Sequence, residues 1–248
     1  KSLKTLATTF YQHIKQQLDD AGLAYEDIKW YATPRRLAVK VSALAEKQAD
    51  KAVEKRGPAT NVAFDSEGNP SKAALGWAKS NGITIEQAER LVTDKGEWLL
   101  HKAVQSGKSI HELLPTMVSN ALAKLPIPKP MRWGSARTQF IRPVHTLTLM
   151  FGEKIIAADI LGVSANNLIK GHRFHHHGLV VLDHADNYEK TLKDAYVEVD
   201  YQTRQDLIVA EIEKAAEQLN GEALFDDELL AEVTSLVEWP VVLVGSFD

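Results

Sequence analysis

The sequence predicts an α+β fold with a mixed or antiparallel β core, a helical insertion and a helix-rich acidic C-terminal part. Apolar residues alternate in short runs near the start of the chain and again after residue 144, and alternation is typical of half-buried strands. Helix-capping signals lie between these runs, and helical spacing dominates the end. We therefore expect a β-rich core formed by 1–57 and 125–182, a helical insertion at 58–124, and an acidic helical part at 183–248.

Composition excludes several classes of protein. The 248 residues are 44% hydrophobic and 25% charged, which is typical of a soluble globular protein. No apolar run is long enough to span a bilayer, so we expect no membrane association and a cytoplasmic location. The chain has no cysteine, which excludes disulfides and thiolate metal sites.

The first 42 residues predict a helix followed by two strands. Apolar residues at helical spacing precede a glycine stop at Gly22, and two alternating runs, 28–32 and 37–41, flank Thr33-Pro34. Arg35 and Arg36 then lie at the turn or at the start of the second strand. Because adjacent strand residues point to opposite faces, one of the two arginines could be packed or salt-bridged inside.

Local signals continue through the expected insertion. Ser71 can cap a helix that stops near Gly82, and Thr84 with Gln87 forms a capping box for a second helix. Residues 97–104 resemble a strand. Ser109 with Glu112 forms another capping box, but a proline inside a helix loses a hydrogen bond. We therefore expect the regular helix to run from about Pro115 to Leu125.

The remaining elements follow from the same patterns. Residues 144–151 and 155–161 predict a hairpin across Gly152-Glu153, and 164–170 reads as a polar loop. Helical spacing then predicts three helices. The remaining expected elements are a strand at 180–182, helices through 188–195, after the cap Asp200 and from Asp227, and a strand at 241–244.

The segment Leu125–His145 is the least replaceable stretch. Pro126, Pro128 and Pro130 alternate, which fixes three φ angles and keeps the residue before each proline out of the helical region. We expect an extended and stiff backbone ahead of Arg132. We call this segment the proline arm.

The proline arm lies inside a window that contains no acid. No Asp or Glu occurs between Glu112 and Glu153, and aromatic side chains are interspersed with the cations. An acid-free arm of this kind suits a polyanion. Arg142 has an alternative, because at a strand start it could be the buried partner of an acid in 183–238. The cations of the window are Lys124, Lys129, Arg132, Arg137 and Arg142, with Trp133 and Phe140 among them.

Charge is unevenly distributed along the chain. Residues 1–182 contain 25 Lys and Arg against 16 Asp and Glu, a net charge of +9. Residues 183–248 contain 4 against 17, a net charge of −13. The basic part could therefore face phosphate while the acidic part faces solvent or a basic partner.

Several sequence blocks resemble those of a known family, the β subunit of the bacterial two-subunit glycyl-tRNA synthetase. The blocks follow one another in order over nearly the whole chain, and the resemblance indicates a partial β subunit that would continue beyond Asp248. They are Thr33–Val39 (TPRRLAV), Glu54–Pro58 (EKRGP), Leu125–Gly134 (LPIPKPMRWG), Phe140–His145 (FIRPVH), Gly171–Phe174 (GHRF) and Glu232–Pro240 (EVTSLVEWP).

The resemblance implies a division of labour in an α2β2 heterotetramer. The class II catalytic site, with its ATP and Mg²⁺, would belong to the α subunit, and the β subunit would supply binding of the tRNA for glycine. This chain would then hold no cofactor, no metal and no catalytic residue, and would be inactive alone. The expected tRNA-binding residues are Arg35, Arg36, Lys129, Arg132, Trp133, Arg137, Arg142, His172 and Arg173.

Two alternatives remain open at this stage. The segment could be purely architectural, contacting the α subunit or the rest of β, with tRNA bound by a later region. It could also be a metal-dependent hydrolase that uses His172, His175, His176 and His177, because His175 and His177 would share a strand face. The chain shows no glycine-rich phosphate loop, nucleophile elbow or His-Glu-x-x-His helix.

Overall fold

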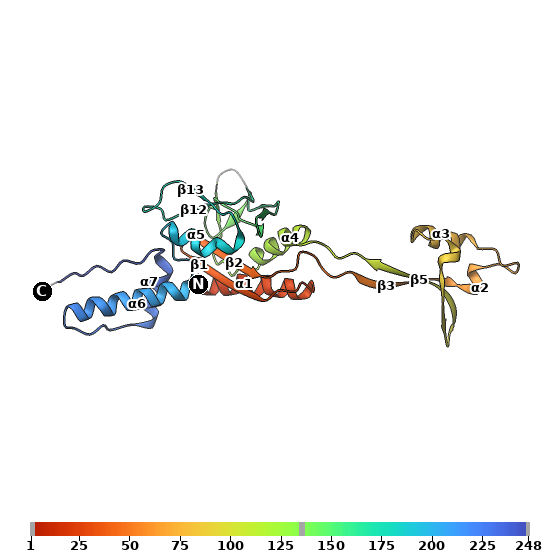
Figure 1. Cartoon of the computed structure of the whole chain (residues 1–248), viewed down its shortest axis with the longest axis horizontal. Helices are drawn as coiled ribbons and strands as arrows, with labels where there is room; N and C mark the ends of the chain where they lie inside the picture. Colours follow the sequence, from red (N-terminus) through yellow and green to blue (C-terminus); the bar gives the residue numbers. More distant parts are fainter. Residues whose placement is uncertain (1–2, 134–136, 247–248) are drawn as a thin grey trace. The chain divides into compact units, whose positions relative to one another are not determined.

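The structure, a computed structural model, describes residues 3–133 and 137–246. It divides into two compact units: a main unit, Lys1–Glu46 with Ser109–Asp248, and an inserted unit, Lys47–Lys108. Figure 1 shows helices and small antiparallel sheets along the whole chain. The predicted α+β class is thus confirmed.

The main unit opens with the predicted helix and hairpin. Helix α1 (Leu3–Asp20) buries Phe10, Ile14 and Leu18, and it is followed by Gly22 at φ +68°. Strands β1 (Asp27–Thr33) and β2 (Arg36–Ser42) pair antiparallel over their full length. Glycine at Gly22 matches the left-handed conformation that commonly ends a helix.

Helix α4 (Ile110–Ala123) begins five residues earlier than predicted. Ser109 and Glu112 form the capping box, and Pro115 lies inside the helix. Its ring removes one backbone hydrogen bond near the N-terminus. The capping box and the complete burial of Ile110 outweigh that loss, so the proline does not set the start of the helix.

The main apolar core lies between α1, α4 and the β1–β2 hairpin. Each fully buried side chain of this type contributes about 1.5–3 kcal/mol of transfer free energy. Its buried members are Phe10, Ile14, Leu18, Leu23, Ile110, Met117, Ala121, Leu125, Leu149, Ile156 and Ile160.

The proline arm is less uniform than predicted. Ile127 N–H donates to the Leu125 carbonyl (2.8 Å), so the chain makes a tight turn around Pro126. Strand β6 (Met131–Arg132) then pairs with β7 (Gln139–Phe140). Gly134, which belongs to one of the resemblance blocks, lies outside the described residues.

Short hairpins replace the longer strands expected between 144 and 182. The predicted turn at Gly152 forms with φ +60°, but Leu161 and Gly162 also have positive φ, so the chain reverses again. The expected polar loop at 164–170 contains a strand. The hairpins are β8 (Met150–Phe151) with β9 (Lys154–Ile155), β10 (Asp159–Ile160) with β11 (Val163–Ser164), and β12 (Leu168–Lys170) with β13 (Leu179–Val181).

The C-terminal part contains the predicted helices. A 3-10 turn η2 (Ala185–Asn187) leads into α5 (Tyr188–Asp194), α6 (Tyr201–Gln218) is capped by Asp200, and α7 (Asp227–Leu236) by Asp226. The prediction of a strand at 241–244 is wrong. That segment has no strand partner among the described residues, and Val241, Leu243 and Val244 are exposed.

The inserted unit differs from the predicted helical insertion at 58–124. It spans 47–108 and is built on a three-stranded sheet in the order β3-β5-β4. Its elements are β3 (Lys51–Ala59), α2 (Thr60–Ala63), α3 (Lys72–Ser80), the 3-10 turn η1 (Ile85–Gln87), β4 (Glu89–Thr93) and β5 (Gly96–Gln105).

Two local interactions explain this difference. The Thr84–Gln87 capping box forms, but it supports only one turn because Ala88 is extended and β4 pairs with β5. A Cβ at Gly57 would lie 2.7 Å from the Trp77 ring. Glycine at this position of β3 therefore lets α3 pack closely on the sheet.

The capping box of α4 gives a testable prediction. The Ser109 hydroxyl accepts the Glu112 N–H (3.3 Å), and the Glu112 carboxylate accepts the Ser109 N–H (2.9 Å). We expect Ser109→Ala to lower the free energy of unfolding by about 1 kcal/mol, measured by urea denaturation. Ser119→Ala, at an exposed position of the same helix, should change it by less than about 0.5 kcal/mol. Equal effects of the two substitutions would contradict the role of the cap.

Candidate nucleic-acid interface

The cations of the proline arm are exposed. Lys129, Arg132, Arg137 and Arg142 lie at the surface, and none of their side chains forms an ion pair or hydrogen bond with another residue in the described ranges. Arg142 is therefore not the buried partner of an acid that was considered above. Four unpaired cations within one acid-free segment produce a positive local potential.

Trp133 and Phe140 are half-buried beside these cations. Phe140 packs against the main apolar core, opposite Met131 across the β6–β7 pair. Phe140 is thus a core residue that anchors the arm. The arm also borders an apolar hollow of about 290 Å³, which is lined by Leu6, Pro126, Ile127, Pro128, Lys129 and Ile141.

Arg35 and Arg36 lie in different environments. The sequence indicated that one of the two could be packed or salt-bridged inside, and that residue is Arg36. Arg35 lies at the β1–β2 turn and is exposed. The Arg36 side chain is only 14% exposed and forms an ion pair with Glu238. Its guanidinium also donates to the carbonyls of Lys170 and Gly171, the latter at 3.1 Å.

Three of the resemblance blocks meet at this ion pair. Thr33 Oγ1 donates to the Glu238 carboxylate (2.7 Å), so the first block holds the acid with two side chains. Gly171 belongs to the GHRF block, and Glu238 to the EVTSLVEWP block. A buried charge of this kind is stable only when paired and hydrogen-bonded, and Arg36 therefore has a structural role here.

A second buried arginine, Arg204 on α6, was not anticipated. Its guanidinium donates to the carbonyls of Thr234 (3.0 Å), Glu198 (2.7 Å) and Ala32 (2.8 Å), and burial lowers its pKa below the usual value. Its spacing from Tyr201 and Ile208, which share the buried face of α6, is the signal that could have revealed it.

The loop between β12 and β13 carries His172 and Arg173. The Nδ1 atom of His172 accepts the N–H groups of Phe174 and His175, each at 3.2 Å. Burial and, next, the neighbouring His175 lower the pKa of His172. The Arg173 guanidinium lies 5.5 Å from the centroid of the exposed Phe174 ring.

The histidines do not form the strand assumed for the metal-dependent alternative. Residues 173–175 form a turn, and the rings of His172 and His175 stack with centroids 4.4 Å apart. Within the described part of the chain, no three His, Asp or Glu side chains are arranged to hold a metal ion. The hydrolase alternative therefore has no geometric support.

A set of charged groups joins β1 to the helices that follow it. Lys29 lies 2.7 Å from Asp200 and 3.6 Å from Glu189, and the Tyr31 hydroxyl donates to Glu189. Burial opposes ionisation of Asp200, but the Lys29 ammonium and the Thr203 N–H outweigh it and keep the pKa of Asp200 below its usual value.

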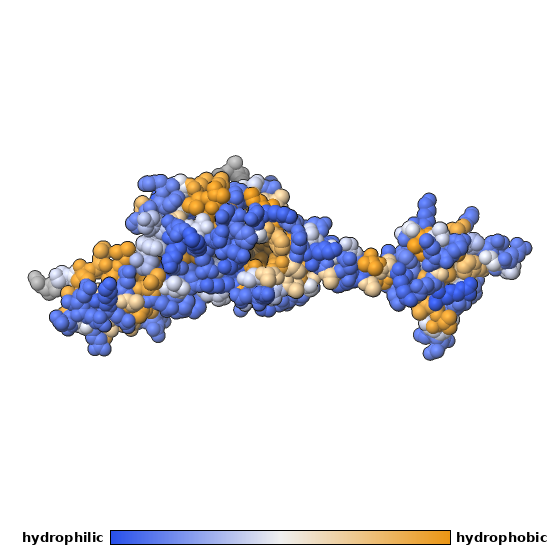
Figure 2. All heavy atoms as spheres, in the orientation of Figure 1, coloured by the Kyte–Doolittle hydropathy of each residue, from blue (hydrophilic) through white to orange (hydrophobic). Residues whose placement is uncertain are grey.

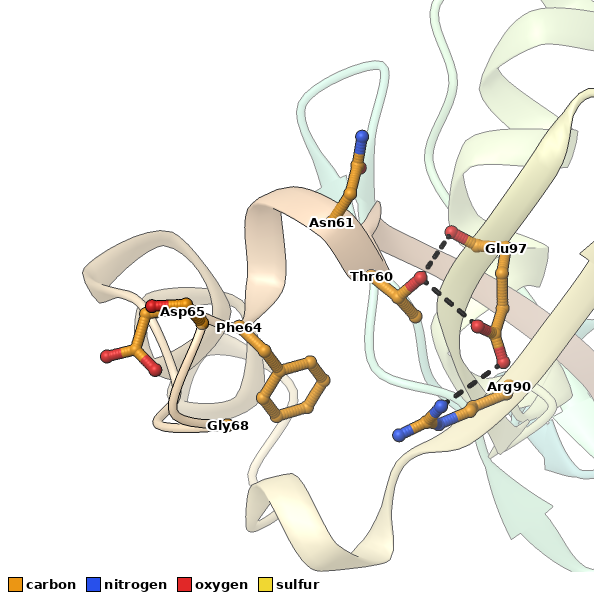
Figure 3. A pocket seen from close by; sticks show the side chains of 8 residues that line it. Thr60, Asn61, Phe64, Asp65, Gly68, Arg90 and Glu97 are labelled. Atoms are coloured by element: carbon orange, nitrogen blue, oxygen red, sulfur yellow. Dashed lines mark hydrogen bonds and ion pairs between the residues drawn. The ribbon is translucent and has the colours of Figure 1, made fainter.

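The inserted unit contains a hollow of about 580 Å³. Figure 3 shows Thr60, Arg90 and Glu97 pointing toward one another there. Glu97 accepts from the Thr60 hydroxyl (3.2 Å) and pairs with Arg90 (3.4 Å). Asp65 also lines the hollow, so its acids outnumber its single, already paired cation, and it is a poor phosphate site.

Comparison with known proteins assigns the chain. Residues 1–248 match the family described as "Glycyl-tRNA synthetase beta subunit". The chain belongs to this family.

Several curated relatives match over the whole length of this beta subunit segment. It is 65% identical to the glycine–tRNA ligase beta subunit of Colwellia psychrerythraea, 56% to that of Psychromonas ingrahamii and 53% to that of Alteromonas mediterranea. In each case the alignment covers 100% of this chain and 36% of the relative. The chain thus spans about a third of the length of these relatives. None of its described helices is long and apolar enough to cross a membrane.

Removing the charge of Glu238 should be costly. Glu238→Gln leaves Arg36 with a buried, uncompensated charge, and we expect a loss of about 3–5 kcal/mol in the free energy of unfolding. Chemical denaturation measures this loss. Glu232→Gln, at an exposed position of α7, is the matched control and should change stability by less than about 0.5 kcal/mol. A loss below 1 kcal/mol for Glu238→Gln would contradict the structural role of the pair.

Asp200 should make stability pH-dependent on the acid side. Because its folded-state pKa is lowered, its contribution is fully present above the unfolded value of about 3.9 and is lost as the pH falls through the folded value. Asp200→Asn keeps a good capping side chain but removes the charge. We expect the variant to be less stable at pH 7 and to lose less stability on acidification, as thermal melts from pH 7 to pH 2.5 would show. Asp206→Asn, an exposed control, should follow the parent, and a parallel curve for Asp200→Asn would disprove the assignment.

Proposed function

We propose that this segment helps to bind and position the tRNA for glycine within glycine–tRNA ligase. The observation that carries the proposal is the row of exposed, unpaired cations on the proline arm, Lys129, Arg132, Arg137 and Arg142. Phosphate contacts by Lys and Arg supply most of the sequence-independent affinity for nucleic acid. The family relationship supports RNA as the polyanion.

The exposed Arg35 and Arg173 extend the proposed contact beyond the arm. The half-buried Trp133 follows Arg132 in the sequence, and the half-buried His172 precedes Arg173. Arg36 is the exception among the predicted tRNA-binding residues, because its donors are already used by Glu238 and two carbonyls. We assign Arg36 to holding Arg35 and the GHRF loop in place. The proposed phosphate contacts are therefore Arg35, Lys129, Arg132, Arg137, Arg142 and Arg173.

The reaction itself would take place on a partner. The resemblance implies that the α subunit carries the class II site and uses ATP and Mg²⁺ there, in the cytoplasm. The described residues of this chain provide no group of acids that could hold a metal ion. In the proposed complex this segment positions the tRNA, and the resemblance assigns the catalytic groups to the α subunit.

An architectural function has its own supporting observation. Figure 2 shows apolar surface on the C-terminal part of the main unit. Exposed patches of this kind commonly mark protein contacts, so this face would contact the α subunit or the rest of β. Its exposed side chains include Leu224, Phe225, Leu229, Leu236, Val241, Leu243 and Val244.

The arm cations provide the test of tRNA binding. In the complete enzyme, Arg132→Gln, Arg137→Gln and Arg142→Gln should each weaken binding about equally for different tRNAs. Each should also lower the magnitude of the salt slope, d log K/d log [salt], by about 0.7–0.9. Filter binding from 50 to 300 mM salt measures both quantities.

Lys214→Gln, an exposed cation of α6, serves as the control and should leave affinity and slope unchanged. If all three arm variants also leave them unchanged, the tRNA proposal fails and the architectural function takes its place.

A further inference from the structure

Five rings form a continuous row on the main unit, which we call the ring row. Phe174, His172 and His175 come from the β12–β13 loop, Tyr196 from the end of α5, and Trp239 from the segment after α7. The centroids of successive rings, in the order Phe174, His172, His175, Tyr196 and Trp239, are 6.1, 4.4, 5.7 and 5.5 Å apart.

Core packing does not explain this row. The Phe174 side chain is 74% exposed and Tyr196 is 44% exposed. A buried aromatic ring removes about 150–250 Å² from water, and these two rings forgo much of that gain. Their exposure indicates a surface that is covered by something else.

Tyr196 also occupies an unfavourable backbone conformation. Its φ is +59° at the end of α5, where Val197 N–H bonds back to the Leu192 carbonyl. Glycine is the usual residue at such a position, and for a bulky residue the left-handed region costs about 1–3 kcal/mol. The fold therefore holds the Tyr196 ring at a strained backbone position, between the rings of His175 and Trp239.

The hydrogen bonds and the ion pair of Arg36 fix the position of the ring row. Arg36 bonds to Gly171, the neighbour of His172, and to Glu238, the neighbour of Trp239. A Cβ at Gly171 would lie 2.7 Å from the His176 ring and 2.9 Å from Ala195, so the loop is tightly seated against the end of α5. The rings are therefore held in place before any ligand arrives.

Cations border the ring row, and the carboxylate next to Trp239, that of Glu238, is already paired with Arg36. Arg173 lies over Phe174 at 5.5 Å, and Arg35 is the chain neighbour of Arg36, which bonds to Gly171 next to His172. Glu238 is already bound to Arg36 and Thr33. Exposed rings flanked by arginines suit a ligand that has flat faces and negative charge.

We propose that the ring row is a platform on which unpaired bases of an RNA stack, with Phe174 and Tyr196 as the two open faces. Arg173 and Arg35 would then lie along the phosphates. Stacking of successive bases on aromatic side chains beside a basic groove is how proteins bind single strands with little sequence preference. The inference rests on the proposed function, because it names the part of the same RNA that this second surface would hold.

The test uses the complete ligase with full-length subunits and two fluorescent RNA probes. One is a single-stranded hexanucleotide and the other is a blunt-ended hairpin whose two strands are joined by a non-nucleotide linker, so that it has no unpaired base. Fluorescence anisotropy gives the affinity of each probe for Phe174→Ala and Tyr196→Ala. Val92→Ala removes an apolar side chain of the inserted unit that is as exposed as Phe174, at 74%, and is the control.

Each ring variant should bind the single strand at least about fivefold more weakly, since stacking is worth about 1–3 kcal/mol per base. The salt slope should stay unchanged for the ring variants and fall by about 0.7 for Arg173→Gln. The affinity of the ring variants for the hairpin probe and that of the Val92→Ala control for the single strand should not change.

Three results would overturn the inference. The first is unchanged single-strand affinity in both ring variants, and the second is an equal loss for the hairpin. The third is a failure of Phe174→Ala to assemble with the α subunit, which would make the row a protein contact. Weaker tRNA binding by the arm variants, together with unchanged ring variants, would sink this inference alone and leave the proposed function standing.

Discussion

An ion pair between Arg36 and Glu238 joins segments of the main unit that lie more than 130 residues apart in the chain. Around it, Thr33 binds the same carboxylate, and Arg204 links the β1 carbonyl of Ala32 to those of Glu198 and Thr234. The guanidinium groups of Arg36 and Arg204 together bond to five backbone carbonyls, those of Lys170, Gly171, Thr234, Glu198 and Ala32. Buried polar groups need such partners, and this arrangement supplies them with side chains instead of a continuous sheet.

The same network connects the small sheets to the C-terminal helices. Among the residues that the structure describes, every sheet of the main unit is two-stranded, and isolated two-stranded sheets are marginal in water. The apolar core between α1, α4 and the β1–β2 hairpin stabilises one side of the unit. A second cluster around Tyr31, Leu192 and Val197 lies on the other side, next to the Lys29, Glu189 and Asp200 charges. Buried polar contacts therefore set the position of the segments that carry the rings, Arg35 and Arg173, whereas Phe140 in the apolar core anchors the cations of the proline arm.

Helix caps depend on neighbouring residues and could largely be predicted from the sequence, whereas strand pairings and ion pairs depend on distant residues and could not. Ser71 and Asp200 each cap the helix that follows, as predicted, because a cap depends on three or four neighbouring residues. The capping box of Ser109 also forms as predicted, but the helix begins there and not at Pro115. The strand β4 was missed because its pairing with β5 overrides a genuine capping box at Thr84. The segment 241–244 alternates like a strand but has no partner in the described part of the chain. At the candidate site, alternation showed that one of Arg35 and Arg36 could be packed, but the choice depended on Glu238, about 200 residues away. Arg204 was hidden for a related reason, since a helical arginine is usually solvated.

The distance between these partners along the chain bears on how the protein folds during its synthesis. The carbonyl of Ala32 and the guanidinium of Arg204 are separated by 172 residues. A ribosome that adds about 5–20 residues per second needs roughly ten to thirty seconds to cover that interval. Throughout this time the emerging β1–β2 hairpin has neither of its arginine-mediated ties to the C-terminal helices. The main unit is thus interrupted by a complete inserted unit whose sheet contacts are all internal to 47–108, so the insertion can mature first while the N-terminal hairpin waits for its C-terminal partners.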